Sequence, residues 1–292
     1  MTTAAESHSG GAASLPSLAV TGVTGTVGRL TAEALADAGV PFRMLARDPV
    51  RAPRLPGSAV LQAAYADADA ARSALEGVAV LFMVSAAENE NRLAEQVTFV
   101  DAAAAAGVGH IVYTSFFRAA PDATFIMARD DYATEQRIRE TGMTFTFLRD
   151  NLYLDFVDGM IGQDDVIRGP AGNGRAAMVA RADVARVAAR VLQDTDSHAD
   201  VTYDLTGPEA LTMAEVAEVL SSRLGRAISF HNETLPEAYE SRKHWKAQQW
   251  QYDAWISNYA AIAAGELAGV TDDVQRVTGR QPLSLSQFLE SR

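Results

Sequence analysis

The chain has 292 residues, of which 48% are hydrophobic and 21% charged, an ordinary globular composition that suffices for one large domain or a domain with a smaller lobe. Its 25 Lys and Arg residues against 37 Asp and Glu give a formal net charge of −12, which would repel a polyanion, so nucleic acid is not expected as a direct partner. Cysteine is absent, which excludes disulfides, thiolate catalysis and cysteine-ligated metals and fits a reducing compartment, so we expect a cytoplasmic protein.

The first 16 residues are rich in Ala, Ser, Gly and Thr and have neither the basic start nor the apolar core of a signal peptide. We therefore expect a disordered tail over residues 1–16 and a folded chain from about Ser17. The longest purely apolar stretch, Val78–Val84, is far shorter than the roughly 20 residues that a membrane-spanning helix needs. The sequence therefore predicts no membrane segment.

Apolar, β-rich runs alternate with longer amphipathic stretches through the first half of the chain. This alternation is typical of parallel strands joined by right-handed helical crossovers, and it predicts a doubly wound α/β sheet. The expected strands cover Leu18–Thr21, Arg43–Ala46, Ala59–Gln62, Val80–Val84, His110–Thr114 and Thr144–Leu148. The expected helices cover Thr26–Ala38, Asp69–Leu75, Asn91–Ala106 and Ala128–Thr141, and each ends near a glycine that can cap it.

The alternation weakens after Asn151. The later elements are predicted as a Gly-rich turn at 169–174, a helix at Asp183–Leu192, a strand at Val201–Leu205 and helices at Leu211–Leu224 and Trp250–Gly265. We therefore expect a Rossmann-type domain over residues 17–152, completed by the strand near residues 201–206. Residues 153–292 are expected to form mostly a smaller C-terminal α/β lobe for the substrate.

Three glycines at a spacing of three follow the first strand and open the first helix, in the segment Thr21–Gly28. Gly22 permits a tight turn, Gly25 lets the backbone approach a pyrophosphate, and Gly28 lets the helix pack against the strand. The helix N-terminus adds free N–H groups for the phosphates. The alternative is a Gly-rich turn that binds nothing. The predicted dinucleotide contacts in this loop are Gly22, Thr24, Gly25, Thr26, Val27 and Gly28.

Cofactor preference is usually set at the end of the second strand, where an acid holds a free ribose and an Arg accommodates a 2′-phosphate. Arg47 occupies that position, and a guanidinium can bind a phosphate through two hydrogen bonds. We therefore expect NADP(H) as the preferred cofactor, with NAD(H) as the alternative. Arg51 is a weaker second candidate, and a solvated surface Arg beside Asp48 is the simpler interpretation of Arg47.

Ligands of open α/β sheets bind at the carboxyl ends of the strands. The two expected strand ends Val84-Ser85-Ala86 and Thr114-Ser115-Phe116 are therefore predicted to contact the cofactor. Ser115 is also a candidate for orienting a substrate oxygen, against the simpler role of a cap. Asp67, after the third strand, is predicted to approach the adenine or to cap the next helix.

Four stretches together resemble the NmrA-like branch of the atypical short-chain dehydrogenases. They are TGVTGTVG at 21–28, LARDP at 45–49, ATEQRIRETGMTFTFLRDNLYLDF at 133–156 and YAAIAAGELAGVTDDVQRVTGRQPLSLSQFL at 259–289. The resemblance implies a cytoplasmic NADP(H)-binding protein with a Rossmann domain and a small substrate lobe, similar to quinone and dye reductases. It also implies that Asn151 lies beside the nicotinamide, against a plain turn-forming role. The family includes regulators that bind the dinucleotide without turnover.

Two neighbouring residues on the fourth expected helix are candidate proton donors. Many short-chain dehydrogenases use a Tyr with a Lys four residues later, but Tyr132 is followed by Gln136 at that spacing. Without the ammonium group Tyr132 should be a poor base, although it could donate a hydrogen bond. Relatives often carry His or Lys at the position of Asp131, which is either a proton donor in a pocket or, as we favour, a solvated carboxylate on the helix surface.

Tyr252, Trp255, Tyr259 and Ile262 form an aromatic stripe at helical spacing. Such a stripe favours a core or a subunit interface over a substrate wall, so a homodimer is compatible with it. The five histidines have no ligand-like spacing, so no metal is expected.

The leading hypothesis from the sequence is an NADPH-dependent reductase that transfers hydride to a small conjugated acceptor such as a quinone, enone or dye. The alternatives are a non-catalytic NADP(H)-sensing regulator and a redox-neutral isomerase or cyclase.

Overall fold

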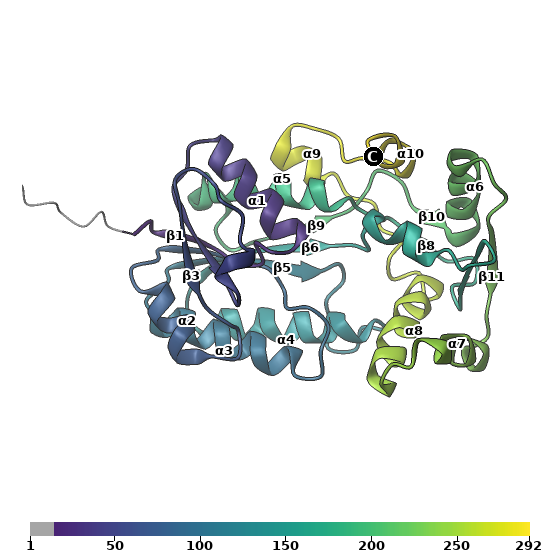
Figure 1. The fold of residues 1–292 in the computed structure, drawn as a ribbon, viewed down its shortest axis with the longest axis horizontal. Coiled ribbons are helices and arrows are strands. Elements are labelled where there is room, and N and C mark those ends of the chain that lie inside the picture. The colour runs from purple at the N-terminus through teal and green to yellow at the C-terminus, as the bar shows by residue number, and fades with distance from the viewer. Residues whose placement is uncertain (1–14) are drawn as a thin grey trace, which may run out of the picture.

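The computed structural model describes residues 15–292, so nearly all of the tail expected at 1–16 lies outside the described residues. The described chain is an α/β body with a smaller lobe at one end (Figure 1). Seven strands form the central sheet, and every neighbouring pair in it is parallel. They are β1 (Leu18–Val20), β2 (Phe42–Ala46), β3 (Ser58–Gln62), β4 (Val80–Met83), β5 (His110–Phe116), β6 (Thr144–Asp150) and β9 (Val201–Leu205).

The strand order is β3-β2-β1-β4-β5-β6-β9. The chain therefore winds outward in one direction from β1 and in the other from β4, which confirms the expected Rossmann-type doubly wound fold. Ligands of such folds bind outside the carboxyl ends of the strands, near the point where the winding reverses. That point lies between β1 and β4, at the edge where the glycine loop follows β1.

Helices cover both faces of the sheet (Figure 1). One face carries α1 (Thr26–Asp37), α5 (Arg181–Leu192) and α9 (Asp273–Thr278), and the other carries α2 (Ala68–Leu75), α3 (Arg92–Ala105) and α4 (Ile126–Glu140). Successive strand residues point to opposite faces, so Val20 and Leu148 pack toward α1 and α5 while Ala19 and Phe147 pack toward the other helices. Burial on both faces explains why these strands are almost continuously apolar.

The strands β5 and β6 are two residues longer at their carboxyl ends than expected. The cause is parallel pairing, which continues from Ser115 with Arg149 to Phe116 with Asp150, while β9 pairs with Asp150 on the other side. Ser115 and Phe116 therefore lie inside a strand. Sequence patterns alone end a strand where apolar residues stop, and polar residues buried in a sheet escape that rule.

The smaller lobe has its own hydrophobic core, formed by residues such as Ile167, Val216, Ala254 and Phe288. Its elements are β7 (Val166–Gly169), β8 (Arg175–Ala176), β10 (Leu211–Thr212), α6 (Met213–Leu224), β11 (Ser229–Asn232), α7 (Leu235–Arg242), α8 (Gln249–Ala263) and α10 (Leu285–Glu290).

Short 3₁₀ helices occur in both parts of the chain, at η1 (Pro49–Arg51), η2 (Leu154–Met160), η3 (Thr195–His198) and η4 (Lys243–Trp245). The helix expected from Leu211 begins at Met213 because Thr212 caps it with Glu215.

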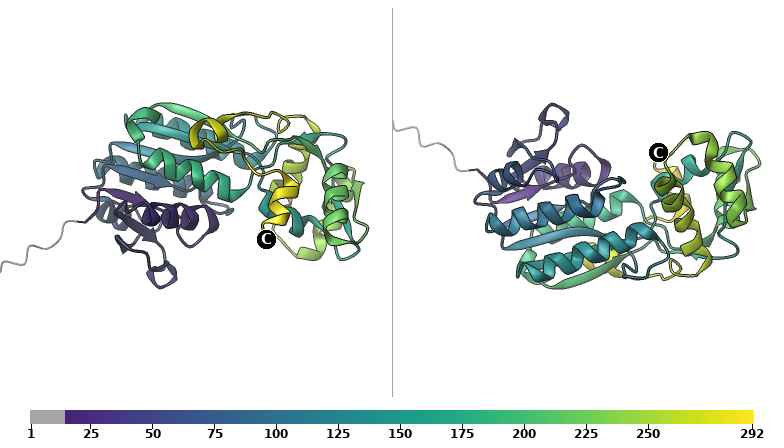
Figure 2. Two further views of the ribbon diagram at one scale, coloured as in Figure 1. Left: turned by 90° about the horizontal axis from the view of Figure 1, so that it is seen from above. Right: turned by 90° about the horizontal axis from the view of Figure 1, so that it is seen from below.

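The lobe lies beyond the carboxyl ends of the strands, as the views from above and below agree (Figure 2). After α8 the chain returns along this edge, where the Leu267 carbonyl accepts hydrogen bonds from the Asn151 side chain and the Ala177 amide. It then forms α9, which packs on α5 and β9 of the body. Among residues 15–292, no helix is both long and apolar enough to cross a membrane.

Candidate cofactor and active site

At two of the three glycine positions in the loop, neighbouring atoms leave no space for a side chain. Gly22 has a φ of +66°, and a Cβ added there would lie 2.7 Å from the Cβ of Val84. A Cβ added at Gly28 would lie 2.4 Å from the Gly22 carbonyl. At Gly25 it would meet only the Gly22 oxygen, at 3.4 Å. Gly22 and Gly28 are therefore required for packing, whereas Gly25 faces open space.

The N-terminus of α1 has no side chain that satisfies it. Gly25 is the capping residue, no side chain accepts a hydrogen bond from the first turn, and that turn contains no acid. Thr24, Gly25 and Thr26 are exposed, and in the part of the chain that the structure describes neither threonine hydroxyl is hydrogen-bonded. Val27 is buried in the core, so its backbone amide alone can face a ligand. This end of α1 has free donors and a positive dipole for an anion.

Arg47 follows β2 directly and is exposed. Within residues 15–292 its guanidinium forms no hydrogen bond or ion pair, while its carbonyl accepts a hydrogen bond from Gln62 at 3.1 Å. The Asp48 carboxylate caps the Val50 amide instead, at 3.1 Å. Arg47 therefore extends from the edge of the sheet as a cation without a protein partner. Arg51 is also exposed, in η1.

The loop after β4 is held by side chains of neighbouring elements. The Thr21 hydroxyl accepts a hydrogen bond from the Val84 amide at 2.9 Å, and the Thr114 hydroxyl accepts one from the Ser85 amide at 2.7 Å. The Tyr65 hydroxyl donates to the Val84 carbonyl at 2.5 Å. These contacts fix the backbone of residues 84–86 at the predicted cofactor edge.

Asp67 serves as the N-cap of α2. Its carboxylate accepts a hydrogen bond from the Ala70 amide at 3.0 Å. The structure therefore realises the capping interpretation of this residue, and its approach to the adenine stays a prediction.

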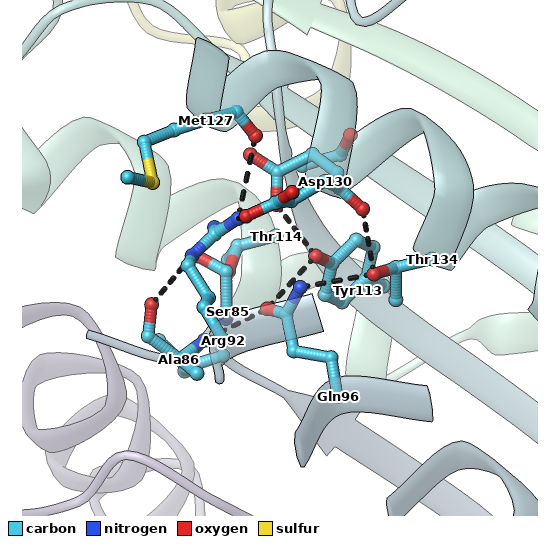
Figure 3. A network of polar contacts seen from close by, with 12 residues as sticks. Ser85, Ala86, Arg92, Gln96, Tyr113, Thr114, Met127, Asp130 and Thr134 are labelled. Carbon is cyan, nitrogen blue, oxygen red and sulfur yellow. Dashed lines mark hydrogen bonds and ion pairs between the residues drawn. The ribbon is translucent and has the colours of Figure 1, made fainter. Parts of the chain in front are cut away.

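A buried polar network lies between α3, α4 and the sheet (Figure 3). Arg92 donates to Asp131 at 2.7 Å and to the Ala86 carbonyl at 3.0 Å, and Tyr113 also donates to Asp131 at 2.7 Å. Gln96 bonds to the Ala86 amide and to Thr134. Burial lowers the pKa of Arg92, but the charges and hydrogen bonds of Asp131 and its neighbours raise it overall.

The surface interpretation of Asp131 is therefore wrong. Only 3% of this residue is exposed, because the spacing of α4 turns Met127, Asp131, Thr134 and Ile138 toward the sheet. Its carboxyl group is paired with Arg92 and accepts hydrogen bonds from Arg92 and Tyr113, which is the arrangement of a structural group.

A second buried pair involves Ser115. Its hydroxyl donates to Glu135 at 2.6 Å, and Arg149 binds the same carboxylate through two hydrogen bonds of 2.8 and 2.6 Å. Ser115 is 3% exposed and points toward α4, so the expectation that it caps a strand end is wrong. Its only donor is used by Glu135, which opposes a substrate-orienting role.

Tyr132 lies near Arg149 and is partly exposed. In the described chain its hydroxyl forms no hydrogen bond, so its proton-donor role stays a prediction. Asn151 is fully buried, and its amide donates to the Leu267 carbonyl at 3.0 Å and accepts from the Leu152 amide at 2.8 Å. These contacts fit the turn-forming interpretation of Asn151 and join β6 to the C-terminal segment.

The aromatic stripe of α8 divides between two environments. Ile262 is buried in the lobe core and Tyr259 packs against that core. Trp255 instead donates its indole N–H to Glu88, in the loop after β4, at 3.2 Å, and contacts Trp245 edge to face at 5.3 Å. The lobe therefore reaches the cofactor edge through an aromatic group.

A family model described as the NmrA-like family matches residues 16–249. This chain belongs to the NmrA-like family. It is 31% identical over 281 residues to the NAD(P)H azoreductase of Xenophilus azovorans, covering 93% of this chain and 96% of that one. It is 37% identical over 267 residues to the (4-alkanoyl-5-oxo-2,5-dihydrofuran-3-yl)methyl phosphate reductase of Streptomyces griseus, covering 89% and 92%. The NADPH complex of an Escherichia coli NADPH-dependent quinone oxidoreductase aligns with a TM-score of 0.86 at 28% identity, over 94% of this chain and 99% of that one.

The free groups of this NmrA-like chain fit a phosphorylated dinucleotide. The uncapped end of α1 offers amide donors to a pyrophosphate, and Gly25 leaves the backbone open to it. Within residues 15–292, Arg47 has no carboxylate partner that would compete with a phosphate. Of the groups at this edge, sequence motifs indicated the loop and Arg47. They missed Arg92, Glu135, Arg149 and Asp150, because no local spacing marks a polar residue that will be buried.

Proposed function

We propose that this chain is an NADP(H)-dependent reductase that transfers hydride to a small conjugated acceptor. The observation that carries the proposal is that two groups able to bind phosphate lie at the same edge of the sheet without protein partners among residues 15–292. The uncapped N-terminus of α1 and the unpaired guanidinium of Arg47 both follow strands that lie side by side. The two relatives described above are named as reductases, and the NADPH-bound structure as a quinone oxidoreductase.

The amides of residues 24–28 are proposed to hold the pyrophosphate and Arg47 the 2′-phosphate, which favours NADP(H) over NAD(H). The adenine side is assigned to Asp67 and the nicotinamide side to residues 84–86, residues 114–116 and Asn151. When bound, the reduced cofactor supplies a hydride. The residues 17–152 with β9 are proposed as the cofactor domain, and most of the remaining chain as the substrate lobe.

The acceptor is proposed to bind between residues 84–91 and the indole rings of Trp245 in η4 and Trp255 in α8. Trp245 is 53% exposed and Trp255 is partly exposed, and Trp255 already touches Glu88 across this boundary. Exposed indole rings offer flat apolar surface on which a planar conjugated molecule can stack. This arrangement favours quinones, enones and aromatic dyes over flexible aliphatic substrates. The homodimer and the cytoplasmic location expected from the sequence stay predictions.

The test begins with titrations of tryptophan fluorescence by NADPH and by NADH, followed by a panel of quinones, enones and dyes while absorbance of the reduced cofactor is recorded. We expect saturable, tighter binding of NADPH, oxidation only when an acceptor is added, and quenching by the acceptor alone because Trp245 and Trp255 line its site. Tight binding without oxidation over the whole panel would favour a sensor. A product formed without net oxidation would favour an isomerase, and failure to bind either nucleotide would overturn the cofactor site.

A further inference from the structure

Asp150 differs from every other buried acid in the described chain. The buried acids within residues 15–292 are Asp131, Glu135, Asp150, Asp183, Glu233 and Asp273. Five of them have an Arg within ion-pair distance, supplied by Arg92, Arg149, Arg186, Arg242 and Arg276. Asp150 has none, although only 5% of it is exposed. A buried carboxyl without a cation favours its neutral, protonated form.

Among the described residues, one side chain is hydrogen-bonded to the Asp150 carboxyl, that of a tyrosine. The Tyr153 hydroxyl donates to Asp150 Oδ2 at 2.6 Å. The Tyr153 ring packs against the hydrophobic cluster that contains Val23 and Val27 of the glycine loop, and the Arg181 guanidinium lies 4.6 Å from the ring centroid. The pair therefore lies on the glycine-loop face of the sheet.

Asp150 is also the last residue of β6, at the carboxyl edge where ligands of this fold bind. The charged groups that act on it come from both layers, with Asp131 and Arg92 on one side and Arg181 on the other. Burial raises the pKa of Asp150 well above its usual range and the charge of Asp131 adds to that, while Tyr153, Arg181 and Arg92 oppose it. Asp150 is therefore a carboxylic acid at the carboxyl edge of the sheet.

We propose that Asp150, hydrogen-bonded to Tyr153, is the proton donor to the reduced acceptor. This inference rests on the proposed reductase function. Two electrons and one hydrogen reach a quinone or enone as hydride from the reduced cofactor, and one proton completes the product. That proton leaves Asp150 as its O–H bond breaks and a new bond forms on the acceptor. The carboxylate that remains is stabilised by the Tyr153 hydroxyl and regains a proton from water.

Acceptors that need no proton provide an internal control for this step. A cationic triarylmethane dye becomes a neutral product by taking up hydride alone, whereas a quinone or an enone needs hydride and a proton. A proton donor should therefore matter for the second group of acceptors and not for the first. Loss of cofactor binding or of folding would slow both groups equally.

The first experiment compares Asp150→Asn with the intact chain on one quinone and one cationic triarylmethane dye. Asn retains an oxygen that accepts the Tyr153 hydrogen bond but cannot release a proton. We expect quinone reduction to fall about 100-fold, a typical contribution of acid catalysis, with dye reduction and the Kd for NADPH within about threefold of the intact chain. The control is Asp158→Asn, which removes an exposed acid of η2 and should change neither reaction.

Equal slowing of both acceptors, or of neither, would overturn the proton-donor role while leaving the reductase function intact. Failure of the intact chain to oxidise NADPH with any acceptor would instead refute the reductase function, and the proton donor with it.

The second experiment needs no turnover. Infrared difference spectra between Asp150→Asn and the intact chain should show a protonated carboxyl band at neutral pH that is missing in the variant. Tyr153→Phe removes a hydrogen bond that stabilises the charged form, so this band should persist to higher pH. The fall of quinone reduction at high pH should shift in the same direction. An ionised Asp150 at neutral pH would refute the proposal. Where Asp150→Asn fails to fold, the test is the pH dependence of the carboxyl band in Tyr153→Phe compared with the intact chain, and no shift of that band would refute the proposal.

Discussion

Polar groups at the glycine-loop edge and on the α4 side of the sheet differ in whether the protein itself satisfies them. At the loop edge the first turn of α1 has no cap, and Arg47 has no partner in the described chain. On the α4 side Arg92 is paired with Asp131, and Arg149 with Glu135, in buried hydrogen-bonded pairs. Polar groups left unsatisfied indicate where a ligand binds, whereas satisfied buried pairs hold the scaffold.

Asp150 lies between these two regions and follows neither rule. It is as buried as the paired acids, yet within residues 15–292 it has no cation at ion-pair distance, and its carboxyl accepts one side-chain hydrogen bond, from a tyrosine. A carboxylate that is paired with a buried cation holds no proton to donate, and taking one up would leave that cation unpaired. Proton donation is therefore expected from Asp150 rather than from Asp131 or Ser115, the residues that sequence patterns indicated.

The largest expected effect is a loss of stability in Arg92→Ala. The substitution leaves the Asp131 carboxylate buried without its cation, so the free energy of unfolding should fall by about 3–5 kcal/mol. Urea unfolding followed by circular dichroism measures this loss. The control is Arg72→Ala, because Arg72 and Asp69 form an exposed pair at 3.7 Å that should contribute less than about 1 kcal/mol. A similar small loss for both variants would mean that the buried pair is not part of the scaffold.

Two substitutions in the glycine loop separate packing from binding. Gly28→Ala places a Cβ 2.4 Å from the Gly22 carbonyl, so it should destabilise the fold by about 3 kcal/mol through overpacking. Gly25→Ala places its Cβ at 3.4 Å from the nearest atom, so stability should change by less than about 0.5 kcal/mol. Because this Cβ faces the open side, the Kd for NADPH should rise by about tenfold, or 1.4 kcal/mol. Unfolding curves and NADPH titrations measure both quantities, and unchanged binding in Gly25→Ala would place the pyrophosphate elsewhere.

The smallest and most specific effect is expected from Arg47→Ala. Loss of a charged hydrogen bond to the 2′-phosphate should weaken NADPH binding by about 1–3 kcal/mol and leave NADH binding nearly unchanged. Stability should not change, because in the part of the chain that is described the Arg47 guanidinium forms no hydrogen bond or ion pair, and Gln62 binds only the backbone carbonyl. Arg280→Ala, which removes another exposed cation, is the control for net charge. Equal weakening of both nucleotides would contradict the assignment of Arg47 to the 2′-phosphate.

The amino-acid sequence by itself determined the parts of this protein that depend on neighbours in the chain. The order of strands and helices in the first half follows from local periodicity. The three glycines of the loop stand within seven residues of one another, and Arg47 follows its strand directly. These features need no distant partner, because backbone geometry and helix ends are set by adjacent residues. The fold class could therefore be predicted, together with the edge at which a dinucleotide would bind.

Only the tertiary structure decided which polar residues are buried and how they are paired. Arg92 and Asp131 are 39 positions apart, and Asn151 and Leu267 are 116 apart. The carboxyl ends of β5 and β6 were also missed, since they contain the polar residues Ser115, Arg149 and Asp150, which pairing with neighbouring strands holds in the sheet. The exceptional position of Asp150 follows from the absence of a cation within ion-pair distance of it among residues 15–292. What surrounds a side chain depends on packing between segments, which no local sequence pattern records.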